Sequence, residues 1–288
     1  MTGITRGLAG VALLLQGARA DMSREAYSSE AAQFYNPTMT RAFAALSTLS
    51  YCPGTEPRVM PKGFVQAVER NCGDGEGSWC KAAGFTVKHG SVKKVMLPDL
   101  NQNNSIFAMV AKWTRQPGGI AKLHVPEPEG CVIAIRGSIG PNPFGANWQR
   151  SYDTAPVEPK EWKHCKNCKV SGGPYKMWNV MKEDVLKKLE ANGCTAPMKS
   201  AIFVTGHSLG AHLSYMAMYE LKSMGFNVLT SYIFASPRPG NTYFTTAFTK
   251  LFKHSKVPLY HVNHGLDRAP VNPDNERLFR HPPFQVFY

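Results

Sequence analysis

The stretch Ala201-Ile202-Phe203-Val204-Thr205-Gly206-His207-Ser208-Leu209-Gly210 organises the interpretation of this 288-residue chain. Its first five residues are apolar or β-branched, which is typical of a short buried strand. Residues 211–224 carry apolar side chains at helical spacing and precede Gly225, so a helix follows. Between the two lies a Gly-x-Ser-x-Gly turn that would expose the Ser208 hydroxyl beside a helix N-terminus. A glycine-rich turn that happens to contain serine is the alternative, but the strand-turn-helix context predicts a nucleophile.

The hexapeptide Gly206-His207-Ser208-Leu209-Gly210-Ala211 resembles the nucleophile turn of the class 3 lipases, the fungal-lipase-like branch of the α/β-hydrolases. Weaker similarities lie in "GANWQRSYD" (145–153), "CKNCKVSGGPYKMW" (165–178) and "FASPRPGN" (234–241). The resemblance covers roughly residues 105–288. It implies an α/β-hydrolase fold, with a mainly parallel central sheet and helices on both faces.

The N-terminus has the layout of a secretory signal peptide. Residues 1–20 contain an arginine, an apolar run over 8–15 and the sequence Ala18-Arg19-Ala20, after which we expect cleavage. A buried N-terminal helix is the alternative. We therefore predict a secreted protein whose residues 21–288 form one domain, a length that suits a single α/β core.

The chain is strongly basic, with a formal net charge of +13 at pH 7. Its lysines and arginines are scattered and accompany no nucleic-acid recognition motif, so we do not expect nucleic-acid binding. A basic surface would favour anionic lipid interfaces or acidic polymers, although it can equally be only a solvated surface. No segment contains 18 consecutive apolar residues, so we expect no transmembrane helix.

Seven cysteines in a secreted protein indicate disulfides, but their connectivity cannot be deduced from spacing. Cys131 opens an apolar strand, and we expect it to be the buried unpaired thiol. His164 with Cys165 and Cys168 could form half of a zinc site, but no second pair completes it. We therefore predict no metal and no organic cofactor.

Alternating strands and helices in the second half predict a parallel sheet. We expect a helix over 27–50, interrupted by a proline, and a disulfide-stapled loop over 66–81. The tail, 263–288, reads as loop. The other expected elements are strands at 85–87, 105–113, 120–125, 131–138, 201–205, 227–235 and 257–262, and helices at 175–190, 211–224 and 242–252.

A serine nucleophile needs a base and an orienting carboxylate, which in α/β-hydrolases follow in the order Ser, acid, His. Asp267 follows the strand "VPLYHV" within Asp-x-x-Pro, which resembles the family's acid, so we assign it that role. Asp274 and a merely turn-capping Asp267 are the alternatives. His281 alone among the histidines follows Asp267, in "RHPPFQVFY", which resembles the family's closing segment. We assign His281 as the base, although a solvated histidine near the terminus would look the same.

The oxyanion formed during ester attack needs two donors. The amide of Leu209, directly after the nucleophile, is one. In "AIRGSIG" the resemblance assigns the second role to Ser138, which follows the preceding strand. The next segment, a lid in this family, is short and rich in glycine and proline, and we expect Ile139 and Phe144 to flank the acyl-binding mouth.

These residues predict a secreted serine hydrolase that cleaves acylglycerol-type carboxylic esters at a lipid-water interface through an acyl-enzyme. A phospholipase A1 or an aryl-ester (feruloyl-type) esterase would use the same machinery. A catalytically silent lipid-binding homologue is a further alternative. The sequence does not indicate the oligomeric state.

Overall fold

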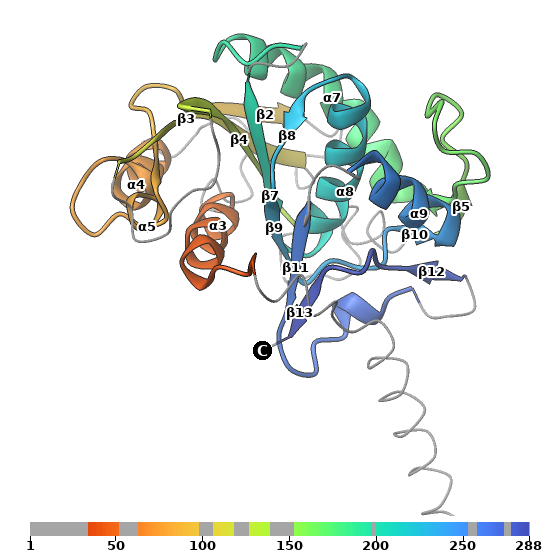
Figure 1. Ribbon diagram of the computed structural model, residues 1–288. Coiled ribbons are helices and arrows are strands. Elements are labelled where there is room, and N and C mark those ends of the chain that lie inside the picture. Colours follow the sequence, from red (N-terminus) through yellow and green to blue (C-terminus); the bar gives the residue numbers. More distant parts are fainter. Residues whose placement is uncertain are drawn as a thin grey trace, which may run out of the picture.

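The computed structural model describes residues 34–51, 63–97, 106–117, 127–138, 153–196, 200–252, 258–273 and 278–287 (Figure 1). The expected leader, the strand at 120–125, and Ile139 and Phe144 lie outside these ranges.

A mixed sheet forms the centre of the molecule. Its strands run in the order β1-β3-β4-β7-β8, with β2 also pairing with β3. Pairs β1–β3, β2–β3 and β3–β4 are antiparallel, whereas β4–β7 and β7–β8 are parallel. The strand bounds are β1 Phe85–Val87, β2 Lys93–Leu97, β3 Ile106–Arg115, β4 Glu129–Ile135, β7 Ala201–Gly206 and β8 Asn227–Val228.

A second sheet, all of whose strands are parallel, continues the mixed sheet beyond β7. It contains β9 (Ser231–Phe234), β11 (Leu259–Asn263) and β13 (Gln285–Phe287), with β11 in the middle. A parallel bridge between His207 and Phe234 joins β9 to the end of β7. The carboxyl ends of β7, β9 and β11 therefore meet at one edge, where active-site groups of α/β sheets gather.

Helices cover both faces of the sheet, as the resemblance implied (Figure 1). On one face lie α3, α4 and α5, and Phe43 of α3 packs against Phe85 of β1 and Phe203 of β7. On the other face α7, α8 and α9 bury Trp178 and Phe248. The helix bounds are α3 Pro37–Leu49, α4 Gly63–Cys72, α5 Trp79–Ala82, α7 Gly172–Glu190, α8 Leu209–Ser223 and α9 Thr242–Leu251.

Alternate side chains of β7 supply both cores, which explains its continuous apolar sequence. Ile202 and Val204 enter the core under α7 and α8, and Phe203 enters the core under α3. Because successive side chains of a strand point to opposite faces, a central strand must be apolar at every position.

A small four-stranded sheet lies beside α9 and contains β12-β10-β6-β5. Asn241 ends β10 and caps α9: its Oδ1 accepts from the amides of Phe244 and Lys169, and its Nδ2 donates to the Asn167 carbonyl. This sheet thereby ties the cysteine-containing loop to α9. Its strands are β5 Pro156–Val157, β6 Val170–Ser171, β10 Gly240–Asn241 and β12 Phe279–Arg280.

Three sequence expectations need correction. Pro37 does not interrupt a helix but is the first residue of α3. The helix begins there because the Asn36 side chain accepts hydrogen bonds from the amides of residues 38 and 39. The stapled loop over 66–81 contains most of α4 and part of α5. The tail is not only loop: it adds β12, the 3-10 helix η1 (Ala269–Val271) and β13.

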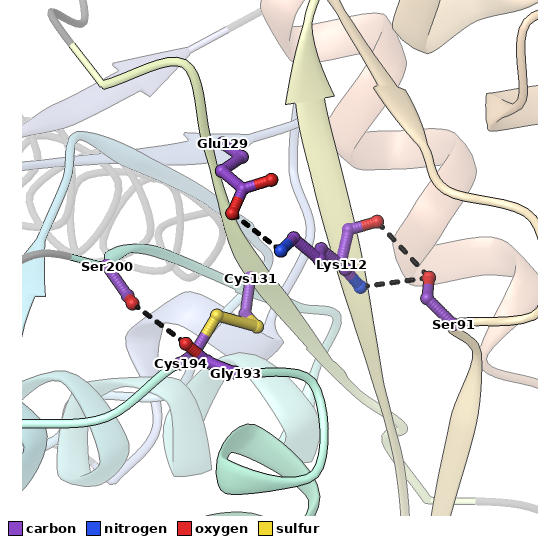
Figure 2. Close-up of polar contacts among 7 residues, drawn as sticks. All are labelled: Ser91, Lys112, Glu129, Cys131, Gly193, Cys194 and Ser200. Carbon is purple, nitrogen blue, oxygen red and sulfur yellow. Dashed lines mark hydrogen bonds and ion pairs between the residues drawn. A yellow bond between two sulfur atoms is a disulfide. The ribbon is translucent and has the colours of Figure 1, made fainter.

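Cys131 is not a free thiol. It forms a disulfide with Cys194, which links the start of β4 to the turn after α7 (Figure 2). Nearby, the Lys112 ammonium pairs with Glu129 at 2.6 Å. A cysteine in an apolar strand is equally suited to a buried disulfide, so its surroundings could not distinguish the two states.

Two further disulfides join Cys72 to Cys80 and Cys165 to Cys168, while Cys52 lies outside the described residues. The second of these pairs uses both sulfurs of the possible half zinc site. In the described part of the chain no group of three or more His, Cys, Asp or Glu side chains could hold a metal ion. No described helix is long and apolar enough to cross a membrane.

Candidate active site

Ser208 stands in the turn between β7 and α8 with φ 56° and ψ −123°. A non-glycine residue in this region of positive φ is strained, and such strain is typical of functional turns. The half-buried serine makes no side-chain cap for α8, although serine is a favoured N-cap residue. Its amide donates to the Phe234 carbonyl at 2.9 Å, which fixes the turn to the end of β9. The turn thus holds Ser208 at the sheet edge, and its role as nucleophile stays a prediction.

The glycines of the turn are required by close backbone contacts. A Cβ on Gly210 would lie 2.1 Å from the Ile135 carbonyl oxygen, and one on Gly206 would lie 2.5 Å from the Gly210 backbone. These atoms belong to the main chain, so they cannot rotate away as the end of a side chain could. The pattern therefore lets α8 start directly against the end of β4.

The two oxyanion candidates lie on adjacent segments. Leu209 is the first residue of α8, where backbone amides lack helical partners and favour negative charge. Ser138 follows β4 and is half-buried. A Cβ on the intervening Gly137 would lie 3.3 Å from the Ser208 Cβ, so the loop before Ser138 passes directly beside the nucleophile.

Arg136, the residue before Gly137, is a buried cation whose guanidinium packs over the Phe107 ring at 5.3 Å. Burial lowers the pKa of Arg136 to about 10, which still leaves it charged at neutral pH. A fixed positive charge in this position would favour negative charge developing near Ser138.

Tyr51 is a site residue that the sequence reasoning missed. Its hydroxyl lies 2.9 Å from Nδ1 of His207 and would be 2.2 Å from a Cβ on Gly137. It therefore fills the space between the oxyanion loop and the nucleophile turn. Burial raises the pKa of Tyr51 to about 12, so the hydroxyl stays protonated and can donate. Tyr51 follows α3 in a segment with no sequence signal for catalysis.

Asp267 lies in the exposed loop after β11, as expected from its position in the sequence. Its Oδ1 accepts a hydrogen bond from the Ala269 amide at 2.9 Å. Desolvation lowers the pKa of His207, and the negative charge of Asp267 acts in the opposite direction. The carboxylate is therefore within electrostatic reach of the residue that precedes Ser208.

The structure does not bring His281 into the expected hydrogen-bonded row. Its imidazole is buried, and Nε2 donates to the Pro270 carbonyl at 2.7 Å. Nδ1 has no hydrogen-bond partner among the described residues. Burial lowers the pKa of His281 to about 3. No hydrogen bond within the described ranges links it to Ser208 or Asp267, so its role as base stays a prediction.

Two other histidines are buried beneath the site. His261 packs its ring 4.5 Å from the His281 ring, and its Nε2 accepts from the Ser236 amide at 2.9 Å. His212 lies within α8, where burial lowers its pKa to about 4. In the part of the chain that the structure describes, neither histidine forms a hydrogen bond with the Ser208 hydroxyl. His264 is exposed in the loop before Asp267.

Solved structures of fungal lipases share this fold. The mono- and diacylglycerol lipase from Aspergillus oryzae is 20% identical, with a TM-score of 0.55 over 86% of this chain and 78% of that one. A Rhizomucor miehei lipase propeptide complex is 18% identical, with a TM-score of 0.57 over 91% and 68%. The likeness extends well beyond the nucleophile turn and identifies the α/β-hydrolase fold of the fungal lipases.

Curated relatives match by sequence over a shorter range. Secreted mono- and diacylglycerol lipase A of Penicillium cyclopium is 26% identical over 140 residues, 49% of this chain and 43% of that protein. A secreted mono- and diacylglycerol lipase of Malassezia globosa is 26% identical over 178 residues, 59% and 56%. The chain thus matches about half the length of these relatives. The sequence pattern of the family described as "Lipase (class 3)" matches residues 132–276, about half of the chain. The chain belongs to the class 3 lipase family.

Proposed function

We propose that this protein is a secreted serine hydrolase that cleaves acylglycerol-type carboxylic esters. The observation that carries the proposal is the strained turn at Ser208. Its side chain makes no capping hydrogen bond to α8, and the turn lies where three parallel strands end. Family membership and relatives named as secreted mono- and diacylglycerol lipases support the substrate class. Three disulfides among the described residues agree with an oxidising compartment.

In the proposed reaction, the Ser208 oxygen attacks the ester carbonyl carbon as its proton passes to a base. The negative charge on the carbonyl oxygen is received by the amide of Leu209 and by Ser138, with the positive charge of Arg136 also contributing. Collapse of the tetrahedral intermediate expels the alcohol, which takes up the proton, and leaves an acyl-serine. Water then attacks the carbonyl carbon of the acyl-serine in the same way, which releases the fatty acid and restores the Ser208 hydroxyl. Asp267 would stabilise the positive charge formed on the base.

The test is hydrolysis of a panel of acyl esters, from soluble short-chain esters to diglyceride, triglyceride, phospholipid and aryl ester. We expect acylglycerols to be preferred, and Ser208→Ala to reduce turnover by at least about 10⁴-fold. Preference for phospholipid or aryl ester would replace the substrate class while keeping the mechanism. Equal activity of wild type and Ser208→Ala would refute the enzyme assignment.

An organophosphonate provides an independent check, because it reacts only with an activated serine. Labelling should be stoichiometric and should map to Ser208.

The predicted short lid, with Ile139 and Phe144 at the acyl-binding mouth, has its own test: a soluble short-chain ester should be hydrolysed without a lipid surface. A strict requirement for an emulsion would contradict it.

A further inference from the structure

Four consecutive backbone carbonyl groups after Asp267 are held by donors from outside their loop. The carbonyl of Pro270 accepts from His281 Nε2 at 2.7 Å. Those of Val271 and Pro273 accept from the Arg238 guanidinium at 3.0 and 2.9 Å. The intervening carbonyl of Asn272 accepts from the Arg238 amide at 2.7 Å. Two residues therefore anchor the whole segment 270–273.

The loop also bonds to itself, since the amides of Val271 and Asn272 donate to the carbonyls of Arg268 and Ala269, but its carbonyls over 270–273 take their donors from outside. Pro270 and Pro273 have no N–H groups, and both are buried. Buried carbonyls without partners are costly, so donors must come from neighbouring elements. Arg238 lies after β9, and His281 lies between β12 and β13. The loop is thus fastened to segments on both sides of β11.

The fastened segment leads directly to the acid. Asp267 Oδ1 accepts from the Ala269 amide, and Ala269 begins η1, the turn whose next residue is held by His281. Movement of Pro270 would therefore displace the amide that orients the carboxylate. The negative charge of Asp267 opposes the lowering of the His207 pKa, so the carboxylate acts electrostatically on the residue that precedes Ser208.

The bonding of His281 conflicts with a role in proton transfer. A ring nitrogen that bonds to a carbonyl must carry hydrogen, so Nε2 has no lone pair free to accept the Ser208 proton. The other nitrogen, Nδ1, is buried and has no hydrogen-bond partner among the described residues, and the ring packs against His261. A general base must reach the proton that it removes, directly or through one water molecule.

We propose that His281 is a positioning residue, which together with Arg238 fixes the Asp267 loop against the nucleophile turn, and that another group accepts the Ser208 proton. This inference rests on the proposed ester hydrolysis. The bond to Pro270 and the burial of the ring both agree with a permanently neutral donor.

Substitution by glutamine separates positioning from proton transfer. His281→Gln retains an N–H donor near the position of Nε2 but cannot act as a base. His281→Leu fills similar space without a donor. Exposed His89, in the turn after β1, supplies the matched control His89→Gln. Each purified variant would be assayed on a soluble ester for kcat, KM and pH profile, with active sites counted by organophosphonate labelling and folding followed by thermal denaturation.

We expect His281→Gln to retain kcat within about 5-fold and to leave the pH profile unchanged. His281→Leu should lose about 100-fold in kcat per labelled site, the effect of a misplaced catalytic group, with KM little altered. Should His281→Leu fail to fold, Arg238→Lys, which keeps the charge but not the two-pronged geometry, should show an intermediate loss in kcat.

Loss of about 10⁴-fold or more in His281→Gln, to the level of Ser208→Ala, would identify His281 as the base and overturn the proposal. Wild-type kcat in both His281 variants would also overturn it, because nothing would then depend on the bond to Pro270. A wild-type protein no more active than Ser208→Ala would instead refute the ester hydrolysis itself, so the two failures are distinguishable.

Discussion

The Tyr51 hydroxyl lies 2.9 Å from His207 Nδ1, although the two residues are 156 positions apart in the chain. It approaches the carbonyl of the same histidine at 3.5 Å and is in tight contact with Gly137. One phenol thereby sets the spacing between the oxyanion loop and the nucleophile turn. Removal of the Tyr51 hydroxyl should therefore affect catalysis more than stability.

For Tyr51→Phe we expect kcat to fall about 10-fold, because the oxyanion loop is no longer held at a fixed distance from Ser208. The net loss of one hydrogen bond should cost about 1 kcal/mol of unfolding free energy. Steady-state kinetics and urea denaturation measure the two effects. An unchanged kcat with reduced stability would show that Tyr51 serves only packing.

Gly210→Ala should destabilise the protein by about 2–3 kcal/mol or prevent folding, because its Cβ would meet the Ile135 carbonyl at 2.1 Å. The matched control is Gly63→Ala: Gly63 begins α4, and a methyl group added to it would meet nothing within 4 Å. That substitution should change the unfolding free energy by no more than about 0.5 kcal/mol. Equal effects of both variants, measured by urea denaturation, would contradict the contact argument.

The buried histidines predict that stability is lost in acid. Burial lowers the folded-state pKa of His212 to about 4 and of His281 to about 3, and that of His261 also falls well below 6.5. Below pH 6.5 the unfolded chain therefore binds more protons than the folded one. Stability is fully present above pH 6.5 and declines as the pH falls towards these values.

Each such histidine contributes a slope on the order of 1 kcal/mol per pH unit. Urea denaturation between pH 7.5 and 5 measures the total slope. In His281→Gln one titrating group is removed, so the slope of stability against pH should fall by the contribution of one proton, on the order of 1 kcal/mol per pH unit. A stability that rises as the pH falls from 7 to 5 would contradict burial of neutral imidazoles.

The disulfides should differ in their contributions to stability. Cys131–Cys194 closes a separation of 63 residues, whereas Cys165–Cys168 closes one of only 3. Because a longer loop loses more entropy when it is closed, the double variant Cys131→Ala/Cys194→Ala should lose about 3–4 kcal/mol. The variant Cys165→Ala/Cys168→Ala should lose clearly less. Chemical denaturation without reductant compares them, and the reverse order would contradict the loop-entropy account.

The nucleophile turn could be predicted because its determinants are local. Gly206, Ser208 and Gly210 lie within five residues, between a strand and a helix of ordinary pattern, and the structure has that strand and helix where they were expected. The position of Asp267 after β11 followed from the same logic, since strand ends meet at one sheet edge.

Contacts between distant segments could not be predicted in this way. Tyr51 reaches His207 across 156 positions, and the Cys131–Cys194 disulfide spans 63. Strand β13 is three residues long and follows two prolines, so only its pairing with β11 defines it. The chain order Ser-Asp-His selected His281, but order carries no information about which carbonyl its imidazole contacts.

The position of β7 has a consequence for how the protein acquires activity. This strand pairs with β4 on one side and bridges to β9 on the other, and the Ser208 amide is bonded to β9. Neither half of the sheet can orient the hydroxyl without the other. During refolding, turnover should therefore recover only with the last docking event, later than helix content, so that ester hydrolysis reports the completed assembly of the chain.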